Sequence, residues 1–315
     1  MRIALVQTNP TVGALASNAD ALLEEAARAR AQGAELVIAS ELVVPGYPPR
    51  DLLDRTAFLR AIDEANRRIV AEVPEGVVLV FGTVVRNEEA RGKPLFNAAI
   101  AARRGQIVAV AKKRLLPSYD VFDEERFFEP GHEAASFELN GERIALTICE
   151  DAWNDDPSKL VQAGAPPSAS DRVRYADNPI ADALKTPARL LVNLSASPFT
   201  LSKMRARPSL FADIAKRHGV AVAFVNQVGG NDELLFDGRS TLYGPDGSIL
   251  ARAAAFAEDL VIADIEKSGP IRPDLEGEEQ AAYDALVMGV RDYVRKCGFS
   301  RVVLGLSGGI DSALV

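Results

Sequence analysis

The chain has 315 residues, and its 44 acidic against 36 basic side chains give a formal net charge of −8. This acidic balance argues against a protein that holds nucleic-acid phosphates on a basic face, because such a face needs an excess of clustered Lys and Arg. Hydrophobic residues make up 48% of the chain and charged residues 25%, which excludes a disordered chain and allows a sizeable core. The length predicts two domains, or one large α/β unit plus a remainder.

The chain contains two cysteines, Cys149 and Cys297, so the sequence predicts neither a disulfide framework nor paired zinc knuckles. The amino-terminal segment lacks the apolar stretch of a signal peptide, and charged residues interrupt every apolar run before it reaches the length of a membrane helix. We therefore expect a reduced, cytoplasmic protein without a membrane or nucleic-acid partner.

A strand, a helix and a strand are predicted to follow one another at the start of the chain. Residues 3–6 form a short apolar run, residues 15–32 an Ala-, Leu- and Glu-rich helix, and residues 35–39 a second apolar run. Gly33 is predicted to end the helix. This spacing is typical of a βαβ unit and favours a sheet covered by helices.

The same kinds of element continue along the chain. Helices are predicted at residues 51–72 and 202–218, and strands at residues 77–85, 143–149, 189–194, 220–228 and 260–265. Hairpin turns are predicted at residues 103–106, 140–141 and 245–247. Hairpins among βα units favour two sheets with helices on their outer faces, an α-β-β-α sandwich, over one parallel sheet. Residues 155–187 are rich in Pro, Ala, Ser and Asp, and we interpret most of them as a surface insertion.

A boundary is predicted at residues 267–273, where Gly and Pro stop the last strand of the sandwich. After it, residues 277–297 are expected to be helical and residues 301–306 to form a strand. We therefore expect a domain over residues 1–265, a linker and helix over 266–300, and the start of a second unit over 301–315.

Three chemically active side chains stand at the ends of predicted strands: Glu41, Lys113 and Cys149. Taken singly, the Glu and the Lys have a simpler interpretation as solvated charges, and the Cys as a buried structural residue. Their motifs together, in this order, resemble the nitrilase or carbon–nitrogen hydrolase superfamily, and the resemblance covers about residues 1–265. It implies a nitrilase-like sandwich fold with Glu, Lys and Cys as the catalytic set.

Three further stretches, residues 119–124, 193–199 and 226–233, narrow this resemblance. They are similar to the glutaminase domain of glutamine-dependent NAD synthetases. The resemblance implies glutamine as substrate, bound by Tyr119, Ser197 and Lys203, in a pocket lined by Tyr47, Phe122 and Trp153.

The residue types suit amide hydrolysis. A thiol nucleophile splits the reaction into formation and breakdown of a thioester, and we assign Cys149 to this role. Glu41 is assigned as the base, and Lys113 is expected to neutralise the oxyanion and to favour the thiolate form of Cys149. If the strand pattern continues past Cys149, Glu150 is expected on the opposite side, and its role is interpreted as structural or pocket-supporting. His132 and His218 are interpreted as surface or packing residues, and no metal site or glutaminase cofactor is expected.

A second motif, Ser-Gly-Gly-Ile-Asp-Ser, occupies residues 307–312 after the predicted strand. A Gly-rich turn alone is often a plain connection, and the absence of Lys-Ser/Thr after the glycines excludes a Walker loop. The order of strand, Gly-rich loop and helix suits a phosphate cradle. The motif resembles the loop of Rossmann-like ATP pyrophosphatase domains, which implies ATP with Mg²⁺ and, in the NAD synthetase family, deamido-NAD as acceptor of the ammonia. The ATP-binding residues implied are Gly305, Leu306, Ser307, Gly308, Gly309, Ile310, Asp311 and Ser312.

The synthetase domain of that family continues well beyond such a loop, so the length predicts a truncated second domain. We expect this chain alone to hydrolyse glutamine and not to make NAD. Two alternatives stay open: a free-standing amidase or carbamoylase with residues 266–315 as a tail, and a non-catalytic scaffold. The motifs at residues 226–233 and 307–312 argue against the first, and the presence of all three catalytic residue types argues against the second. The resemblance also implies a homo-oligomer.

Overall fold

The computed structural model describes residues 1–155 and 175–315. Its strands are β1 (Arg2–Gln7), β2 (Leu36–Ile38), β3 (Val78–Arg86), β4 (Leu95–Arg103), β5 (Gln106–Lys112), β6 (Ala135–Leu139), β7 (Glu142–Ile148), β8 (Leu190–Ser195), β9 (Ala221–Asn226), β10 (Val228–Asn231), β11 (Leu234–Asp237), β12 (Thr241–Tyr243), β13 (Ile249–Arg252) and β14 (Asp259–Asp264). Its helices are α1 (Leu15–Ala31), η1 (Arg50–Asp54), α2 (Thr56–Glu72), α3 (Glu124–Phe127), η2 (Cys149–Ala152), α6 (Pro179–Ala183), α7 (Lys203–His218), α8 (Glu278–Lys296) and α9 (Ile310–Leu314), of which η1 and η2 are 3₁₀ turns.

Two six-stranded mixed sheets form the body of the molecule. Their strand orders are β14-β1-β2-β3-β4-β5 and β13-β12-β9-β8-β7-β6. Strands joined through helices pair in parallel, as in β1-β2-β3 and β7-β8-β9, whereas the three predicted hairpins pair antiparallel. A two-residue connection can only reverse the chain, while a parallel neighbour needs a crossover. The predicted hairpins are thereby confirmed.

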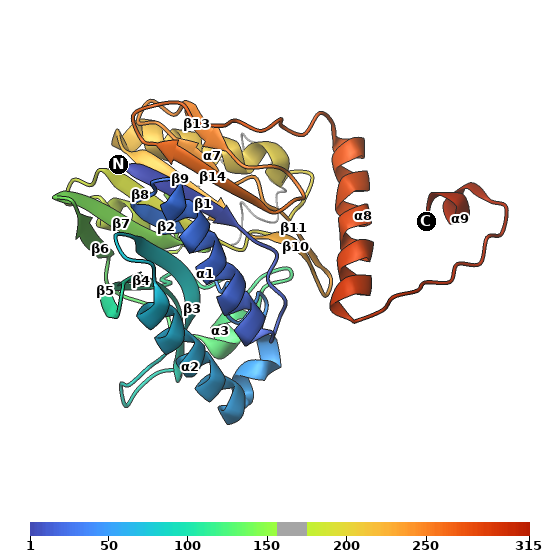
Figure 1. Ribbon diagram of the computed structural model, residues 1–315, viewed down its shortest axis with the longest axis horizontal. Coiled ribbons are helices and arrows are strands. Elements are labelled where there is room, and N and C mark those ends of the chain that lie inside the picture. Colours follow the sequence, from blue (N-terminus) through green and yellow to red (C-terminus); the bar gives the residue numbers. More distant parts are fainter. Residues whose placement is uncertain (156–174) are drawn as a thin grey trace.

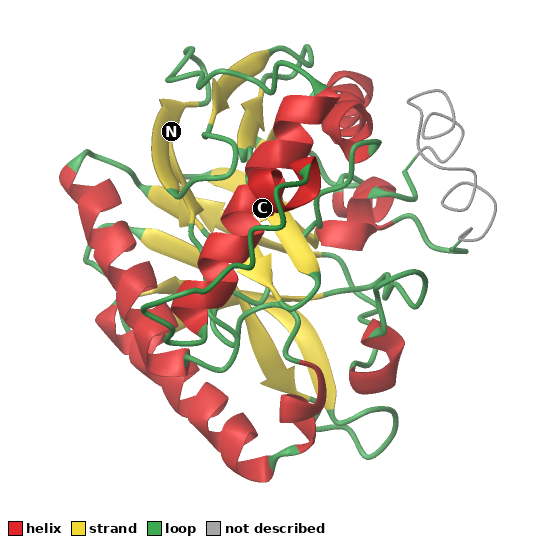
Figure 2. Cartoon of the chain, turned by 90° about the vertical axis from the view of Figure 1, so that its right-hand side faces the viewer, coloured by secondary structure: helices red, strands yellow, loops and turns green. Residues whose placement is uncertain are grey.

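Side chains alternate between the two faces of each strand and form three layers of hydrophobic core, one between the sheets and one on the outer face of each sheet. Ile3 and Leu5 point between the two sheets, where they join Ile144 and Leu146 of the second sheet. Their neighbours on β1 point the other way and pack with α1 and α2, while the outer face of the second sheet packs with α6 and α7. Strands that are buried on both faces read as continuous apolar runs, as these do. The predicted α-β-β-α sandwich is confirmed, and Figure 2 shows the strands in the interior with helices outside them.

Several predicted elements differ from the structure. The helix predicted over residues 51–72 is divided at Arg55 into η1 and α2. The strand predicted over 220–228 ends at Asn226, and β10 pairs separately with β11. Of the predicted insertion at 155–187, residues 156–174 lie outside the described residues, and the remainder contains α6.

The strand predicted at residues 301–306 is wrong. These residues have no regular structure, and the side chain of Val303 is fully exposed. An apolar run becomes a strand only when a neighbouring strand satisfies its backbone groups, and no other strand of the described chain pairs with this run. Figure 1 shows the segment leading away from the sandwich between α8 and α9.

No helix among residues 1–155 and 175–315 combines the length and apolar character that a bilayer crossing requires.

Candidate functional site

Cys149 comes directly after the last residue of β7, at the first position of the turn η2. Its φ of +43° lies in the left-handed region that a residue with a Cβ seldom adopts. The residue is 5% exposed. A strained, buried residue at a strand end is a common feature of functional sites.

Glu41 and Lys113 form a fully buried ion pair. Lys113 Nζ donates to Glu41 Oε1 at 2.7 Å, and both side chains have 0% exposure. Glu41 also accepts from Asn97 Nδ2 at 2.7 Å and from the backbone N–H of Ala196 at 2.8 Å. These contacts fix the carboxylate from the first sheet, through β4, and from the end of β8 in the second. The two predicted residues therefore lie together where the sheets meet.

A glycine on β3 lets the segment that carries Glu41 approach the sheet. A Cβ placed on Gly82 would lie 2.5 Å from the Cα of Glu41 and 2.3 Å from the backbone N of Leu42. Both contacts are with backbone, which cannot move aside without displacing Glu41. Gly82 is therefore required by close approach rather than by an unusual φ.

A second carboxylate, Glu124, completes this cluster. Its Oε1 accepts from Lys113 Nζ at 2.8 Å and from the Tyr47 hydroxyl at 2.9 Å. Glu124 is the last residue of the 119–124 motif in the sequence, but the sequence reasoning gave it no role. The only available signal was its place in that motif, because its partners are remote along the chain.

Burial and charge shift the protonation of this cluster. Burial alone would lower the pKa of Lys113, but Glu124 and Glu41 raise it well above its ordinary value, so Lys113 stays charged. Burial, helped by the charge of Glu41 and opposed by that of Lys113, raises the pKa of Glu124 to about 7.

Lys113 acts on the pKa of Cys149 in the expected direction, toward the thiolate, but other effects are larger. Burial, together with the charge of Glu41, raises the pKa of Cys149 well above its ordinary value, and Lys113 offsets these effects only in part. Lys113 is already paired with two carboxylates, so little of its charge is left to stabilise a thiolate. Burial therefore favours the thiol form of Cys149.

The two acidic residues after Cys149 have separate contacts. Asp151 accepts from the backbone N–H groups of Ile148, Arg114 and Leu115 at 2.9–3.0 Å, which ties the Cys149 turn to the segment just after Lys113. The side expected for Glu150 depended on the strand continuing to that residue, and this condition is not met because β7 ends at Ile148. Glu150 Oε1 instead accepts from the Tyr119 hydroxyl at 2.9 Å.

Four of the residues implied in glutamine binding lie together near this turn. Lys203 Nζ lies 5.6 Å from the ring centre of Phe122 and 5.7 Å from that of Trp153, and Tyr119 packs edge-on against Phe122. Burial, helped by the charge of Arg207, lowers the pKa of Lys203, while the charge of Glu150 acts in the opposite direction. The cluster thus combines aromatic faces with one cation.

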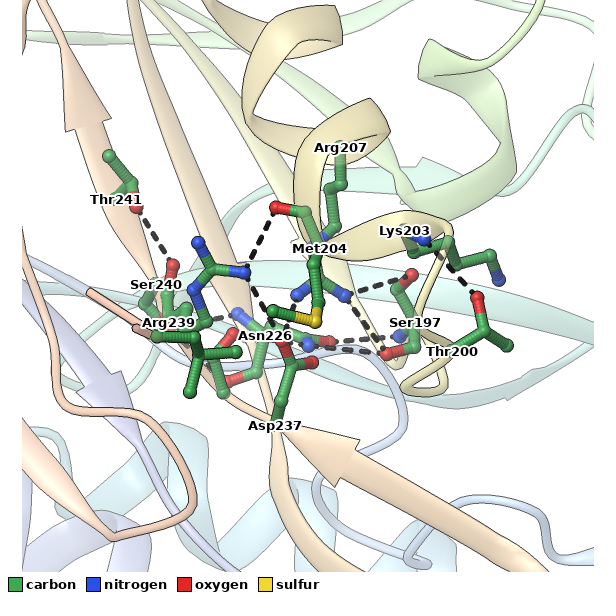
Figure 3. A network of polar contacts seen from close by, with 12 residues as sticks. Ser197, Thr200, Lys203, Met204, Arg207, Asn226, Asp237, Arg239, Ser240 and Thr241 are labelled. Carbon is green, nitrogen blue, oxygen red and sulfur yellow. Dashed lines mark hydrogen bonds and ion pairs between the residues drawn. The ribbon is translucent and has the colours of Figure 1, made fainter. Parts of the chain in front are cut away.

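Ser197 belongs to a neighbouring buried network (Figure 3). Its backbone N–H donates to Asn226 Oδ1 at 2.8 Å, and Arg207 donates to its hydroxyl and its carbonyl oxygen at 3.4 Å. Arg207 is also paired with Asp237, and both side chains are at most 2% exposed. Sequence reasoning missed Arg207, although it lies four residues, or about one helical turn, after Lys203 on α7.

The loop implied in ATP binding lies away from this cluster, at the end of the exposed carboxyl-terminal segment (Figure 1). The hydroxyls of Ser307 and Ser312 are 2.9 Å apart, and the backbone N–H of Gly309 donates to Ser307 Oγ. The loop thus offers hydroxyl and N–H donors and one carboxylate, Asp311, which suit a phosphate with a divalent cation. Residues 1–155 and 175–315 contain no group of three His, Cys, Asp or Glu placed to hold a metal ion.

The chain is similar to glutamine-dependent NAD(+) synthetases over almost its whole length. It is 40% identical to the enzyme of Synechocystis sp., covering 99% of this chain and 56% of that protein, and 37% identical to that of Acinetobacter baylyi, covering 99% and 54%. The chain therefore spans about half the length of the curated relatives it matches. The NAD synthase family profile matches residues 282–315.

Comparison with solved structures finds similarity to the same kind of enzyme. The glutamine-dependent NAD+ synthetase of Acinetobacter baumannii in complex with ADP superposes with a TM-score of 0.82 at 34% identity, covering 99% of this chain and 55% of that one. A nitrilase-superfamily amidase of Nesterenkonia AN1 shares the fold, with a TM-score of 0.67 at 24% identity over 84% of this chain and 90% of its own. The carbon-nitrogen hydrolase profile matches residues 2–166 and 171–269. The chain belongs to the carbon-nitrogen hydrolase family.

Proposed function

We propose that this chain hydrolyses the side-chain amide of glutamine through a Cys149 thioester and releases ammonia. The observation that carries this proposal is the buried Glu41–Lys113 ion pair beside a strand-end cysteine, in a carbon-nitrogen hydrolase whose relatives are glutamine-dependent NAD synthetases. A base, a cation and a thiol in one water-poor site suit attack on an amide, which is a weak electrophile.

The first half-reaction forms the thioester. Because the resting Cys149 is a thiol, Glu41 takes its proton as sulfur attacks the amide carbon. The carbonyl oxygen becomes negative, and Lys113 stabilises it, because the proton taken by Glu41 has neutralised one of the two carboxylates paired with the lysine. Glu41 then returns the proton to the amide nitrogen, the carbon–nitrogen bond breaks, and ammonia leaves.

The second half-reaction hydrolyses the thioester. Glu41, again ionised, accepts a proton from a water molecule that attacks the thioester carbon. The carbon–sulfur bond breaks, the Cys149 sulfur regains a proton, and glutamate leaves. Glu124 keeps Lys113 in place between the two carboxylates, and Tyr47 in turn hydrogen-bonds to Glu124.

We assign glutamine recognition to the residues around Lys203. The ammonium of Lys203 suits the α-carboxylate of the substrate, and Tyr119 and Ser197 supply hydroxyl groups. Tyr47, Phe122 and Trp153 supply the aromatic walls. Arg207 supports this arrangement through its contacts with Ser197.

For the intact enzyme, we propose that the ammonia amidates deamido-NAD with ATP and Mg²⁺. Similarity to the NAD synthetases and the match of residues 282–315 support this proposal. Residues 1–265 would form the glutaminase, 266–300 the linker and helix, and 301–315 the start of the nucleotide-binding unit, with ATP at Gly305, Leu306, Ser307, Gly308, Gly309, Ile310, Asp311 and Ser312. A cytoplasmic homo-oligomer is part of the same proposal.

Steady-state ammonia release from glutamine tests the glutaminase directly. Cys149→Ala is expected to abolish it, while Cys297→Ala, which changes the exposed second cysteine, leaves it unchanged. The enzyme should prefer glutamine to aliphatic amides and nitriles, because the latter cannot use Lys203. Activity retained in Cys149→Ala refutes the mechanism, and a preference for aliphatic amides favours an amidase instead.

A further inference from the structure

A lysine with an unusual set of partners lies at the carboxyl-terminal end of α8, outside the site described above. Lys296 Nζ lies 2.6 Å from Asn9 Oδ1, 2.8 Å from Asn231 Oδ1 and 3.1 Å from the carbonyl oxygens of Pro10 and Gly230. These acceptors are amides rather than carboxylates, and they come from two segments remote from α8 in sequence. Burial lowers the pKa of Lys296 to about 8.

Asp292, one turn earlier on α8, contacts the same two segments. Its Oδ2 accepts from Asn9 Nδ2 at 2.8 Å and from the backbone N–H of Gly230 at 2.9 Å. The side-chain amide of Asn9 is therefore held at its oxygen by Lys296 and at its nitrogen by Asp292. We refer to Asn9, Gly230, Asn231, Asp292 and Lys296 as the α8 clamp.

Two glycines bring the helix close enough for these contacts. A Cβ on Gly230 would lie 3.3 Å from the Cα of Gly289 on α8, and a Cβ on Gly289 would lie 2.7 Å from the side chain of Leu235. The helix and the β10–β11 hairpin therefore meet almost backbone to backbone, and Figure 1 shows α8 standing beside this hairpin.

The clamp continues to the tyrosine that touches the catalytic cluster. Asn231 Nδ2 donates to the backbone carbonyl of Tyr47 at 3.0 Å, and the Tyr47 hydroxyl donates to Glu124 at 2.9 Å. Glu124 in turn accepts from Lys113. Three side chains, those of Asn231, Tyr47 and Glu124, thus separate Lys296 from the proposed oxyanion-stabilising cation.

A second set of contacts connects Lys296 with the loop at residues 45–47, which we call the Tyr47 loop. Lys296 holds the carbonyl oxygen of Pro10, and three residues later the backbone N–H of Gly13 donates to Pro45 O at 2.8 Å. Gly46 packs so closely that a Cβ there would lie 2.7 Å from the Cα of Val12. The clamp therefore supports the Tyr47 loop in two ways, through Asn231 and through the segment that follows Pro10.

Docking of α8 alone does not explain the clamp. Ala281, Ala285 and Met288 already bury an apolar face of the helix against the sandwich. A partly buried ammonium adds a desolvation cost that an apolar residue at position 296 would avoid. What the ammonium supplies is fixed geometry, because its donors hold amide oxygens of separate segments at defined positions.

We propose that Lys296 and Asp292 are positioning residues for glutamine hydrolysis. Lys296 holds Asn231 directly and Asp292 holds the adjoining Gly230, and together they place the Tyr47 hydroxyl on Glu124 through Asn231. The inference rests on the proposed glutaminase function. It makes α8, whose residues from 282 onward match the NAD synthase profile, a part of the glutaminase machinery. Displacement of α8 would release the Tyr47 loop and slow amide cleavage.

The test compares Lys296→Met with Arg295→Met, an exposed neighbour that removes the same charge from the same end of α8. In the 315-residue chain, Lys296→Met should lower kcat about tenfold, the change that about 1.4 kcal/mol of transition-state stabilisation produces. KM for glutamine should change less than about twofold, since the clamp contacts only the backbone carbonyl of Tyr47 and none of the side chains assigned to substrate binding. Rates are normalised to active sites titrated by a covalent glutamine analogue, and Arg295→Met should match the parent.

A double-mutant cycle with Tyr47→Phe separates positioning from general destabilisation. If Lys296 acts through the Tyr47 hydroxyl, adding Lys296→Met to Tyr47→Phe should lower kcat by less than about twofold. If the two substitutions lower kcat by independent factors that multiply in the double variant, the proposal is overturned. An unchanged kcat in Lys296→Met overturns it as well. Should Lys296→Met not fold, Lys296→Gln, which keeps a neutral donor, takes its place in the cycle.

Hydrogen exchange provides a readout that does not depend on activity. The Gly46 amide, bonded to Leu42 O at 2.9 Å, should exchange at least about tenfold faster in Lys296→Met than in Arg295→Met. Unchanged exchange at Gly46 refutes the coupling even if the helix end frays. A parent chain without glutaminase activity refutes the proposed function instead, and hydrogen exchange then decides on the clamp alone.

Discussion

Replacement of Arg207 by Met should both destabilise the protein and weaken glutamine binding. Arg207 and Asp237 are 2% and 1% exposed, so the substitution leaves a buried carboxylate without its main partner. Breaking such a pair typically costs about 3–5 kcal/mol. Arg239 lies 3.8 Å from the same carboxylate and compensates in part. We therefore expect the free energy of unfolding to fall by about 3 kcal/mol, near the lower end of this range. The melting temperature should fall by roughly 6 °C, at about 2 °C per kcal/mol for a chain of this size.

The kinetic consequence concerns Ser197. Arg207 donates to its hydroxyl and its carbonyl oxygen, whereas Asn226 holds its backbone N–H independently. Loss of the Arg207 contacts should therefore loosen the side chain without releasing the segment. KM for glutamine should rise about three- to tenfold, the range expected for one lost hydrogen bond, with a smaller change in kcat.

Urea unfolding monitored by circular dichroism, together with glutaminase kinetics, checks both effects. Arg205→Met, an exposed position on the same helix, is the matched control and should change stability by less than about 0.5 kcal/mol. Arg207→Met/Asp237→Asn removes both charges and should recover at least half of the lost stability, because no buried charge is left unpaired. A single variant that loses less than about 1 kcal/mol, or a double variant no more stable than the single one, contradicts this reasoning.

Three further predictions follow from the site. Gly82→Ala should lower kcat at least about 100-fold, since its Cβ would meet the backbone at Glu41; near-normal kinetics would show that the loop can move aside. Glu124 holds its proton more tightly in the folded protein, with a pKa raised from 4.5 to about 7, so it stabilises the fold below pH 4.5 and this contribution is lost as the pH rises through 7. Glu124→Gln should therefore reduce the fall in unfolding free energy between pH 5 and pH 7 measured by urea titration, and an unchanged slope contradicts the assignment. Lys203→Met should raise KM for glutamine at least about tenfold while leaving the slow hydrolysis of small aliphatic amides unaffected; equal losses on both substrates would assign Lys203 to the chemistry instead.

The sequence alone predicted most of the sandwich. Some local patterns are enough to predict a structure. The apolar run at residues 3–6 predicts a strand because burial on both faces requires apolar residues, and Asn140-Gly141 predicts a hairpin turn because a positive φ favours these residue types. The run at residues 301–306 is also largely apolar but forms no strand, since strand pairing depends on a neighbouring strand that composition does not reveal.

Glu41, Lys113 and Cys149 were also accessible from the sequence, because each stands in a motif at the end of an apolar strand. The fold added what distant parts of the chain contribute: Glu124 beside Lys113, Arg207 beneath Ser197, and Lys296 holding the Tyr47 loop through Asn231. It also showed that the effect of Lys113 on the pKa of Cys149, although in the expected direction, is outweighed by burial and the nearby Glu41. Residue type and order thus determined which groups are the candidates for the chemistry. Their charge states and supporting contacts depend on three-dimensional proximity and exclusion of water, which a linear pattern does not contain.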